Sequence, residues 1–236
     1  MFFLWLFFIT IAHSQTNTLT DAETQGRALA QRIINQLEIP ASENITNTGT
    51  LAIRNKHEKQ SLPIAFKILV TATNWVSLYE ATTTNGVESI SCPHSPDYSG
   101  DLEYHTPVPF SFDGMALSDR SFAGSDFSVG DLTLNFFHWP GQKVLKKDIH
   151  RSCGCIVLES TNPEPGTNGY SRVMSWIDTD SLGIVEAYAY DRNGKQLKDF
   201  EPENVKKVNG QWQVETLLME NVQTGSKSRI EFDLKK

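Results

Sequence analysis

The three cysteines carry the most distinctive chemistry in this sequence. Cys153 and Cys155 are separated by one glycine, and Cys92 stands far earlier in the chain. An odd number leaves at least one thiol unpaired. The pair leads into Ile156-Val157-Leu158, a stretch typical of a buried strand, where cysteine often serves as a small apolar side chain. These residues favour a structural role, or a disulfide from Cys92 to one of the pair, over a redox dithiol.

A metal site is a further alternative for the cysteines. It would recruit His94 and His150 together with the three thiols. Their spacing matches none of the common zinc patterns, in which thiolate ligands come as close pairs. We therefore predict no metal and no cofactor.

Two carboxylates, Asp126 and Asp131, are the other candidates for chemistry. Both stand where a short helix is expected to begin, and carboxylates there serve for capping and interact favourably with the helix dipole. The sequence holds no G-x-S-x-G, H-E-x-x-H, P-loop or G-x-G-x-x-G motif. We predict no catalytic residue and no enzymatic activity.

The elements that must position these residues begin with one helix. Thr20-Asp21-Ala22-Glu23 is a capping box, and Pro40 ends the helical pattern. The helix has an apolar stripe that must lie on another element. The stripe consists of Ala22, Leu29, Ala30, Ile33, Ile34 and Leu37.

The rest of the chain alternates apolar and polar residues, as strands do. Asn85-Gly86 and Asp191-Arg192-Asn193-Gly194 suit tight hairpins between them. We predict a mainly β fold with some helix (α+β), built on a strongly curved antiparallel sheet. The predicted strands lie near 49–55, 62–70, 74–80, 87–91, 144–151, 153–160, 170–178, 183–191, 195–201, 204–208, 211–221 and 227–234.

The stretch from Cys92 to Trp139 interrupts this pattern with several prolines and glycines. We predict a loop with one short helix that crosses the sheet. Leu132, Phe136 and Phe137 are expected to share one helical face. Ser125, Asp126 and Ser128 are the candidate N-caps.

Composition limits the function further. The 21 Lys and Arg residues against 28 Asp and Glu residues give a net charge of -7, which argues against nucleic acid as a partner. The apolar run Phe2–Ala12 is shorter than the roughly 20 residues that span a bilayer. With the small residues Ala12 and Ser14 behind it, it predicts a signal peptide of residues 1–14. We expect an exported mature chain without a transmembrane segment, and a single domain over residues 20–236.

A set of short motifs in the second half of the chain resembles a known family. In this order they resemble the outer-membrane lipoprotein-sorting proteins of the LolA-like superfamily, in particular its uncharacterised periplasmic branch. The resemblance covers residues 120–234 well and residues 20–119 in element order alone. The motifs are Gly124-Ser125-Asp126-Phe127-Ser128, Asp131-Leu132, Cys155-Ile156-Val157-Leu158-Glu159-Ser160, Trp176-Ile177-Asp178, Glu186-Ala187-Tyr188, Asp191-Arg192-Asn193-Gly194-Lys195, Met219-Glu220-Asn221 and Thr224-Gly225.

The resemblance implies a half-open β-barrel, covered by the N-terminal helix and the short loop-helix, whose apolar cavity binds acyl chains. It implies a non-enzymatic periplasmic carrier or chaperone for a lipid or an acylated lipoprotein, which delivers its cargo to the outer membrane. Aromatic residues are the candidate cavity lining, although an ordinary core role is the default for each one. The candidates are Trp75, Tyr79, Phe110, Phe122, Phe127, Phe136, Phe137 and Trp139.

Two other functions are consistent with the same residues. The first is a structural or protein-interaction module of the cell envelope, with a protein partner and without lipid cargo. The second is a thiol enzyme that uses Cys153 and Cys155.

Overall fold

The computed structural model describes residues 20–37, 43–71, 75–95, 98–99, 103–107, 115–166, 169–208 and 211–234. The predicted signal peptide, residues 1–14, lies outside the described residues. No helix in the described ranges is both long enough and apolar enough to cross a bilayer.

The first element is the predicted helix, α1 (Asp21–Leu37). The backbone N–H of Glu23 donates to Thr20 Oγ1 over 3.3 Å, and the N–H of Thr20 donates to Glu23 Oε2 over 2.8 Å. These two bonds confirm the capping box, which satisfies N–H groups that have no partner within the helix. Leu29, Ala30 and Ile33 of the predicted stripe are buried.

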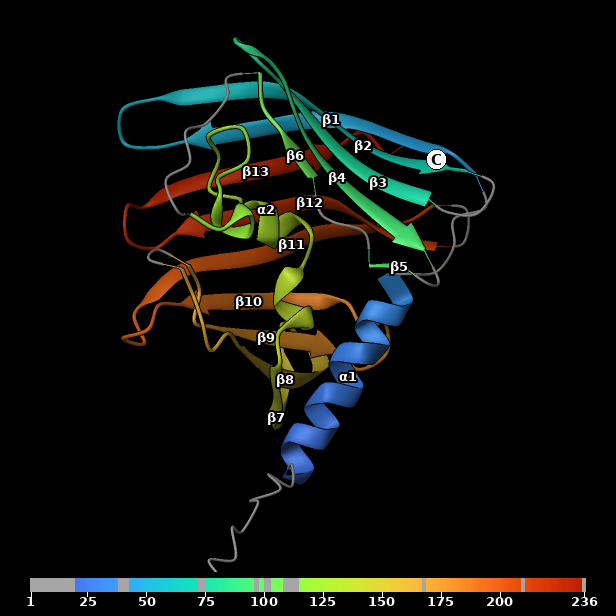
Figure 1. Ribbon diagram of the computed structural model, residues 1–236, viewed down its shortest axis with the longest axis vertical. Coiled ribbons are helices and arrows are strands. Elements are labelled where there is room, and N and C mark those ends of the chain that lie inside the picture. Colours follow the sequence, from blue (N-terminus) through green and yellow to red (C-terminus); the bar gives the residue numbers. More distant parts are fainter. Residues whose placement is uncertain are drawn as a thin grey trace, which may run out of the picture.

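All the strands belong to one antiparallel sheet, which confirms the predicted fold class (Figure 1). The order along the sheet is β5-β4-β3-β2-β1-β13-β12-β11-β10-β9-β8-β7, and β6 pairs with β4. Most neighbours in this order are also neighbours in sequence, as hairpin connections require. The strands are β1 (Ile45–Arg54), β2 (Lys59–Val70), β3 (Trp75–Thr83), β4 (Gly86–Ser95), β5 (Tyr98–Ser99), β6 (Glu103–His105), β7 (Gly141–His150), β8 (Cys153–Thr161), β9 (Arg172–Asp178), β10 (Ile184–Tyr190), β11 (Gln196–Val208), β12 (Gln211–Asn221) and β13 (Ser226–Phe232).

Two predictions for the sheet are wrong. The stretch from Cys92 to Trp139, expected to be a loop with one short helix, also contains the end of β4 and the strands β5 and β6. The two strands expected at 195–201 and 204–208 form the single strand β11, which runs through Pro202. Asn204 has a φ of 49° and no partner in the register with β12, while Glu203 and Val205 on either side are paired. The register with β12 is the same on both sides of Asn204, since Glu203 pairs with Thr216 and Val205 with Val214. The strand therefore continues through this left-handed residue without an extra residue.

The segment of residues 115–139, called here the cover segment, contains three short helical pieces. They are η1 (Leu117–Asp119), α2 (Val129–Leu132) and η2 (Asn135–His138), the first and last being 3₁₀ turns. Ser128 is the N-cap of α2 and forms a capping box with Asp131, which confirms the structural role predicted for that carboxylate. The single short helix predicted here is thus divided.

The cause of this division is Leu134, which adopts a left-handed φ of 52° directly before η2. A left-handed residue ends the α-helical path and turns the chain. Leu132 therefore joins one core cluster, whereas Phe136 and Phe137 join another. The expectation that these three residues share one helical face is wrong.

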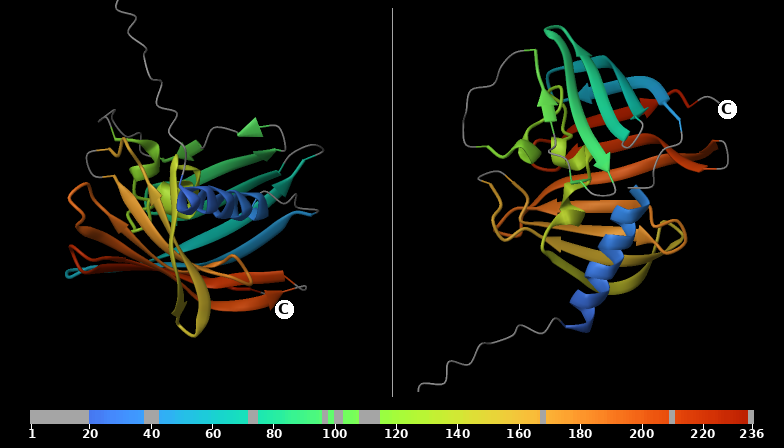
Figure 2. Two further views of the ribbon diagram at one scale, coloured as in Figure 1. Left: turned by 90° about the horizontal axis from the view of Figure 1, so that it is seen from below. Right: turned by 45° about the vertical axis from the view of Figure 1, so that its right-hand side comes forward.

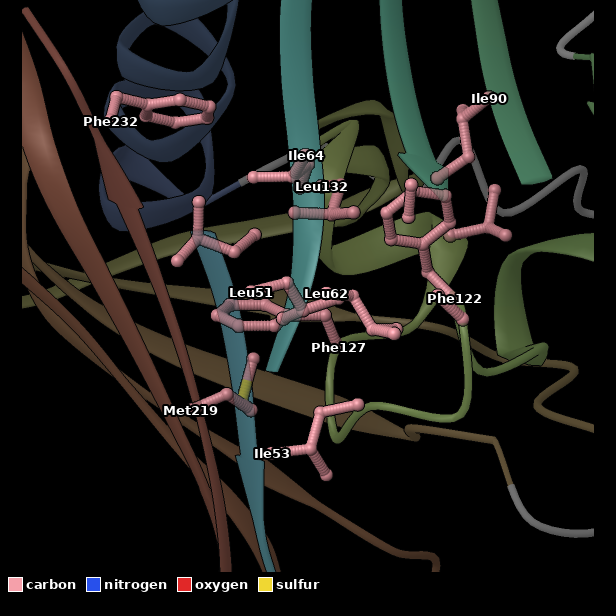
Figure 3. Packing of buried hydrophobic residues seen from close by; sticks show 14 residues of the cluster. Leu51, Ile53, Leu62, Ile64, Ile90, Phe122, Phe127, Leu132, Met219 and Phe232 are labelled. Carbon is pink, nitrogen blue, oxygen red and sulfur yellow. The ribbon is translucent and has the colours of Figure 1, made fainter. Parts of the chain in front are cut away.

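The sheet curves strongly, and α1 and the cover segment lie inside its curve (Figures 1 and 2). Two core clusters fill the concave side. The first cluster joins β1–β4 and β12–β13 to the cover segment (Figure 3), and the second joins β8–β10 to α1 and η2. Two elements outside the sheet thus bury most of its apolar face.

The contact between α1 and β7 is very close at one residue. Gly26 lies against the backbone of β7, and a Cβ built on it would be 2.5 Å from the nitrogen of Lys143 and 2.6 Å from the carbonyl carbon of Gln142. Only glycine lets a helix backbone approach a strand backbone this closely. Gly26 therefore sets the distance of α1 from the sheet.

Candidate functional site

The cover segment is fixed to β13 by the carboxylate of Asp126. Ser226 Oγ donates to Asp126 Oδ1 over 2.5 Å, and Ser228 Oγ donates to Oδ2 over 2.8 Å. Ser228 Oγ also accepts the backbone N–H of Asp126 over 2.8 Å. A carboxylate with several donors is held firmly, because hydrogen bonds to charged groups are stronger than those between neutral groups.

A second carboxylate, Glu88 on β4, holds the other side of the cover segment. Glu88 Oε2 accepts the N–H of Ala123 over 2.9 Å and the hydroxyl of Tyr104 over 2.7 Å. Burial is the main cause that raises the pKa of Tyr104, and its bond to Glu88 adds to this. The cover segment is thus attached by polar contacts to strands on both sides of the first core cluster.

A polar group lies buried where the two core clusters meet. Asp131 Oδ2 accepts from the N–H of Ser128 over 2.7 Å, from the hydroxyl of Tyr170 over 3.0 Å and from Nζ of Lys198 over 3.3 Å. Lys198 also donates to the carbonyl of Asp126. Burial, followed by the charge of Asp131, raises the pKa of Tyr170 well above its ordinary value. The ion pair is accordingly a third link between the cover segment and the sheet.

Two cavities adjoin this polar group, and both are lined by Tyr170 and Lys198. The smaller, called here the apolar cavity, has a volume of about 10 Å³, which is close to the space of one water molecule. Its other lining residues are Asp131, Phe136, Val173, Ala187, Ala189, Phe200 and Met219. The larger, called here the polar cavity, has a volume of about 260 Å³ and is also lined by Asp119, Ser128, Leu197, Asn221, Gln223 and Thr224.

Four of the aromatic residues proposed as cavity lining are buried in the core clusters. Phe122 and Phe127 belong to the first cluster, where both are fully buried (Figure 3). Phe136 and Phe137 belong to the second, and their ring centroids lie 4.5 Å apart. Of the four, Phe136 also lines the apolar cavity. Their side chains occupy the space that an acyl chain would need.

The remaining candidates are more dispersed. Trp75 is buried at the start of β3, and Trp139 packs at the border of the second cluster. The ring of Tyr79 lies 4.8 Å from that of Phe66, and burial raises the pKa of Tyr79 to about 12. Phe110 lies outside the described residues. The predicted lining is therefore spread over both clusters rather than gathered around one hollow.

The cysteines form no disulfide with one another. Cys92 lies on β4, and eight strands separate β4 from β8 in the sheet order, so the proposed bond from Cys92 to Cys153 or Cys155 is wrong. Burial raises the pKa of the Cys155 thiol, which disfavours the thiolate that redox chemistry needs. Among the described residues no group of three or more Cys, His, Asp and Glu side chains is arranged to hold a metal ion.

The polar cavity is lined by three residues that were not predicted from the sequence, namely Asp119, Tyr170 and Lys198. One signal was available for Lys198, because it shares a strand face with Phe200 and therefore stands on the apolar side of an alternating pattern. A charged residue on the apolar face of a strand needs a buried partner. Nothing local to Asp119 or Tyr170 shows that they meet this lysine.

Comparison with solved structures shows a common fold at low sequence identity. The chain matches a DUF1329 family protein from Desulfovibrio piger with 18% identity and a TM-score of 0.65, over 91% of this chain and 92% of that one. It matches an outer membrane lipoprotein-sorting protein domain from Vibrio parahaemolyticus with 17% identity and a TM-score of 0.65, over 90% and 92%. A LolA superfamily protein from Nitrosomonas europaea has 16% identity and a TM-score of 0.59, over 87% and 91%.

Comparison of sequences identifies one family to which the chain is similar. The search of curated proteins finds no match. A family model with the description "Uncharacterized protein" matches residues 115–235, which is just over half of the sequence. The matched part begins with the cover segment and includes β7 to β13. The chain therefore belongs to the family of this model, and its fold is the LolA-like fold of the outer-membrane lipoprotein-sorting proteins.

Proposed function

We propose that this protein is a non-enzymatic carrier, which binds the acyl chains of a lipid or lipoprotein on the concave face of its half-barrel in the periplasm. In this proposal it delivers the cargo toward the outer membrane. The proposal is supported by one observation above all: the apolar face of the sheet is covered by elements outside the sheet, namely α1 and the cover segment.

Acyl binding in this proposal requires the cover segment to move. The apolar cavity has a volume of about 10 Å³, far less than the several hundred Å³ of a typical ligand pocket. Phe122 and Phe127 fill the space between the cover segment and the sheet. Their withdrawal would open the concave face, and an acyl chain would then replace one apolar contact by another.

The attachments of the cover segment are suited to such movement. Asp126 with Ser226 and Ser228, Glu88 with Ala123, and Lys198 with Asp131 are side-chain contacts rather than strand pairing. Each group can exchange its partner for water when the segment moves, so breaking one such bond costs about 1.5–3 kcal/mol rather than its full interaction energy. The sheet itself keeps all its backbone hydrogen bonds.

A reversible disulfide between the cover segment and β13 tests the proposal. Ser228 Oγ lies 2.8 Å from both the amide nitrogen and Oδ2 of Asp126, so the two side chains face one another and a cysteine is placed at each position. The double variant Asp126→Cys/Ser228→Cys is titrated with a fluorescent fatty acid under oxidising conditions and again after reduction. We expect uptake to be lost when the disulfide is formed and restored by the reductant.

The wild-type protein under the same two conditions is the control for its own thiols, and mass spectrometry of peptides verifies the new bond. Equal uptake by the oxidised and reduced variant would rule out movement of the cover segment. Absence of uptake by the wild type, together with purification free of any acylated mass, would rule out the carrier.

A structural or protein-interaction module of the envelope is the second candidate. The filling of the concave face by Phe122, Phe127, Phe136 and Phe137 favours it, because a sheet that only supports a surface needs no ligand space. Isolation of one stoichiometric protein partner by lipid-free protein, with no uptake of the fatty acid, would establish this function instead.

A further inference from the structure

The polar cavity lies between the cover segment and the sheet, beside the β12–β13 turn. Its polar lining comes from η1, from Tyr170, from β11 and from the turn, through Asp119, Tyr170, Lys198, Asn221, Gln223 and Thr224. Its volume is about 260 Å³, which is enough for the head group of a lipid but not for a whole lipid.

Most of the polar groups around this cavity already have partners. Asn221 Oδ1 accepts the backbone N–H groups of Gln223 and Thr224 over 3.0 and 3.1 Å. Thr224 Oγ1 lies 2.8 Å from Ser226 Oγ, and Lys198 is shared between Asp126 and Asp131. These contacts fix the shape of the wall.

Asp119 is different, because within the described part of the chain no cationic side chain forms a salt bridge with it. A Cβ built on Gly166 or Gly169 would be 2.6 Å from its Oδ2, so backbone encloses this oxygen on one side. Burial raises the pKa of Asp119, a hydrogen bond with the Ser118 side chain lowers it, and the charges of Asp131 and Lys198 act in opposite directions. A cation beside this carboxylate would relieve the cost of its burial.

The charges around the cavity are unequal. Lys198 lines the polar cavity but is paired with Asp131, which lies in the wall of the apolar cavity, so the charge of Asp119 remains uncompensated when this carboxylate is ionised. The potential inside the cavity therefore favours a ligand with a positive charge.

The apolar cavity shares Tyr170 and Lys198 with the polar cavity, so the two cavities are neighbours. Its walls include Phe136, Phe200 and Met219, which come from both core clusters. The boundary between the clusters thus begins at the polar cavity. A ligand with a polar head and an apolar chain matches a polar cavity with an apolar cavity beside it.

We propose that the polar cavity binds the ammonium-bearing head group of an acylated ligand, with Asp119 as its counter-ion and the acyl chain directed along the boundary between the core clusters. The inference rests on the proposed carrier function. The ammonium is either the ethanolamine group of a phospholipid or the amino group of an acylated peptide, since both present the same chemistry to Asp119.

Competition between ligands of equal chain length tests the head group. Wild-type protein loaded with a fluorescent fatty acid is titrated with lysophosphatidylethanolamine and with lysophosphatidylglycerol. A palmitoylated peptide with one lysine and its glutamine counterpart form the second pair. We expect the ammonium ligand of at least one pair to compete about tenfold better, because a charge-assisted hydrogen bond of this kind is worth about that factor.

The variant Asp119→Asn should remove this preference, so that the two ligands of a pair compete equally. Asp180→Asn, in an exposed turn, is the matched control and should keep the preference. The pair in which the ammonium ligand competes better shows whether a phospholipid or an acylated peptide is recognised.

Equal competition within both pairs by the wild type, or a preference that survives in the folded Asp119→Asn variant, would overturn the inference. The wild-type comparison does not depend on the variant being stable. If acyl ligands bind without head-group preference, the carrier function stands and this inference alone fails. If no acyl ligand binds, the carrier function itself fails.

Discussion

The ammonium of Lys198 on β11 lies 3.3 Å from Oδ2 of Asp131 in the cover segment, and both side chains are largely buried, at 17% and 7% exposure. The pair joins the sheet to the cover segment at the boundary between the two core clusters. Tyr170 completes it through its hydroxyl, 3.0 Å from the same oxygen. The stability of the cover segment therefore depends on Lys198.

Replacement of Lys198 by methionine removes the charge and keeps the length of the side chain. Asp131 retains two hydrogen-bond donors but loses its cation, so we expect the free energy of unfolding to fall by about 2 kcal/mol. Urea denaturation measures the change. Lys195→Met, at an exposed position of the β10–β11 turn, should change stability by less than about 0.5 kcal/mol. Equal effects of the two substitutions would contradict a stabilising role of the ion pair.

Valine at Gly26 should displace α1 from β7. The new Cβ would meet backbone atoms of Gln142 and Lys143, which cannot move aside as a side chain would. We expect a loss of about 2 kcal/mol and increased binding of a hydrophobic dye, because Leu29 and Ile33 become accessible. Ala28→Val, at an exposed position of the same helix, measures the helix-propensity cost alone, at most about 0.7 kcal/mol. Unaltered dye binding by Gly26→Val would show that α1 tolerates a greater distance from the sheet.

Asp199 should make the protein less stable at neutral pH than an asparagine in its place. Burial raises the pKa of Asp199, and the nearby carboxylates of Glu186 and Glu220 raise it further. The folded protein therefore binds this proton more tightly than the unfolded chain, so the contribution of Asp199 to stability falls as the pH rises through its folded-state pKa.

The variant Asp199→Asn should accordingly have a higher Tm than the wild type at pH 7. The difference should shrink as the pH falls toward 3.8, the ordinary pKa of the side chain. Scanning calorimetry between pH 4 and 7 measures it, with the exposed Asp180→Asn as the control. A lower Tm for Asp199→Asn at pH 7 would show that Arg151 and Lys227, which lower this pKa, outweigh the two glutamates.

Cys155 should resist alkylation in the folded protein. Its side chain is 1% exposed, and burial raises the pKa of its thiol. Cys153, two residues away, is half-buried and should react first. Iodoacetamide labelling followed by peptide mass mapping, before and after unfolding, distinguishes the two thiols. Labelling of both at one rate in the folded state would revive a redox role for the pair.

Local patterns in the sequence predicted most of the secondary structure. Thr20 and Glu23 begin α1, and Ser128 and Asp131 begin α2. Apart from the predicted division of β11, alternation reproduces the strands after Val144 to within a few residues. These features depend on contacts between residues close in the chain, so their signals are present in short windows. The family motifs predicted the LolA-like fold in addition.

The candidate site depends on contacts between residues that are far apart in the sequence. Lys198 meets Asp131, Asp126 meets Ser228, and Gly26 meets the backbone of β7, each across a large part of the chain. The left-handed turn at Leu134 likewise placed Leu132 and Phe136 in different core clusters. The sequence by itself determined most of the strands, the apolar face of each, and where α1 and α2 begin. The tertiary structure alone decided that the concave face is filled and where its polar cavity lies, because both depend on how separate elements pack inside one curved sheet.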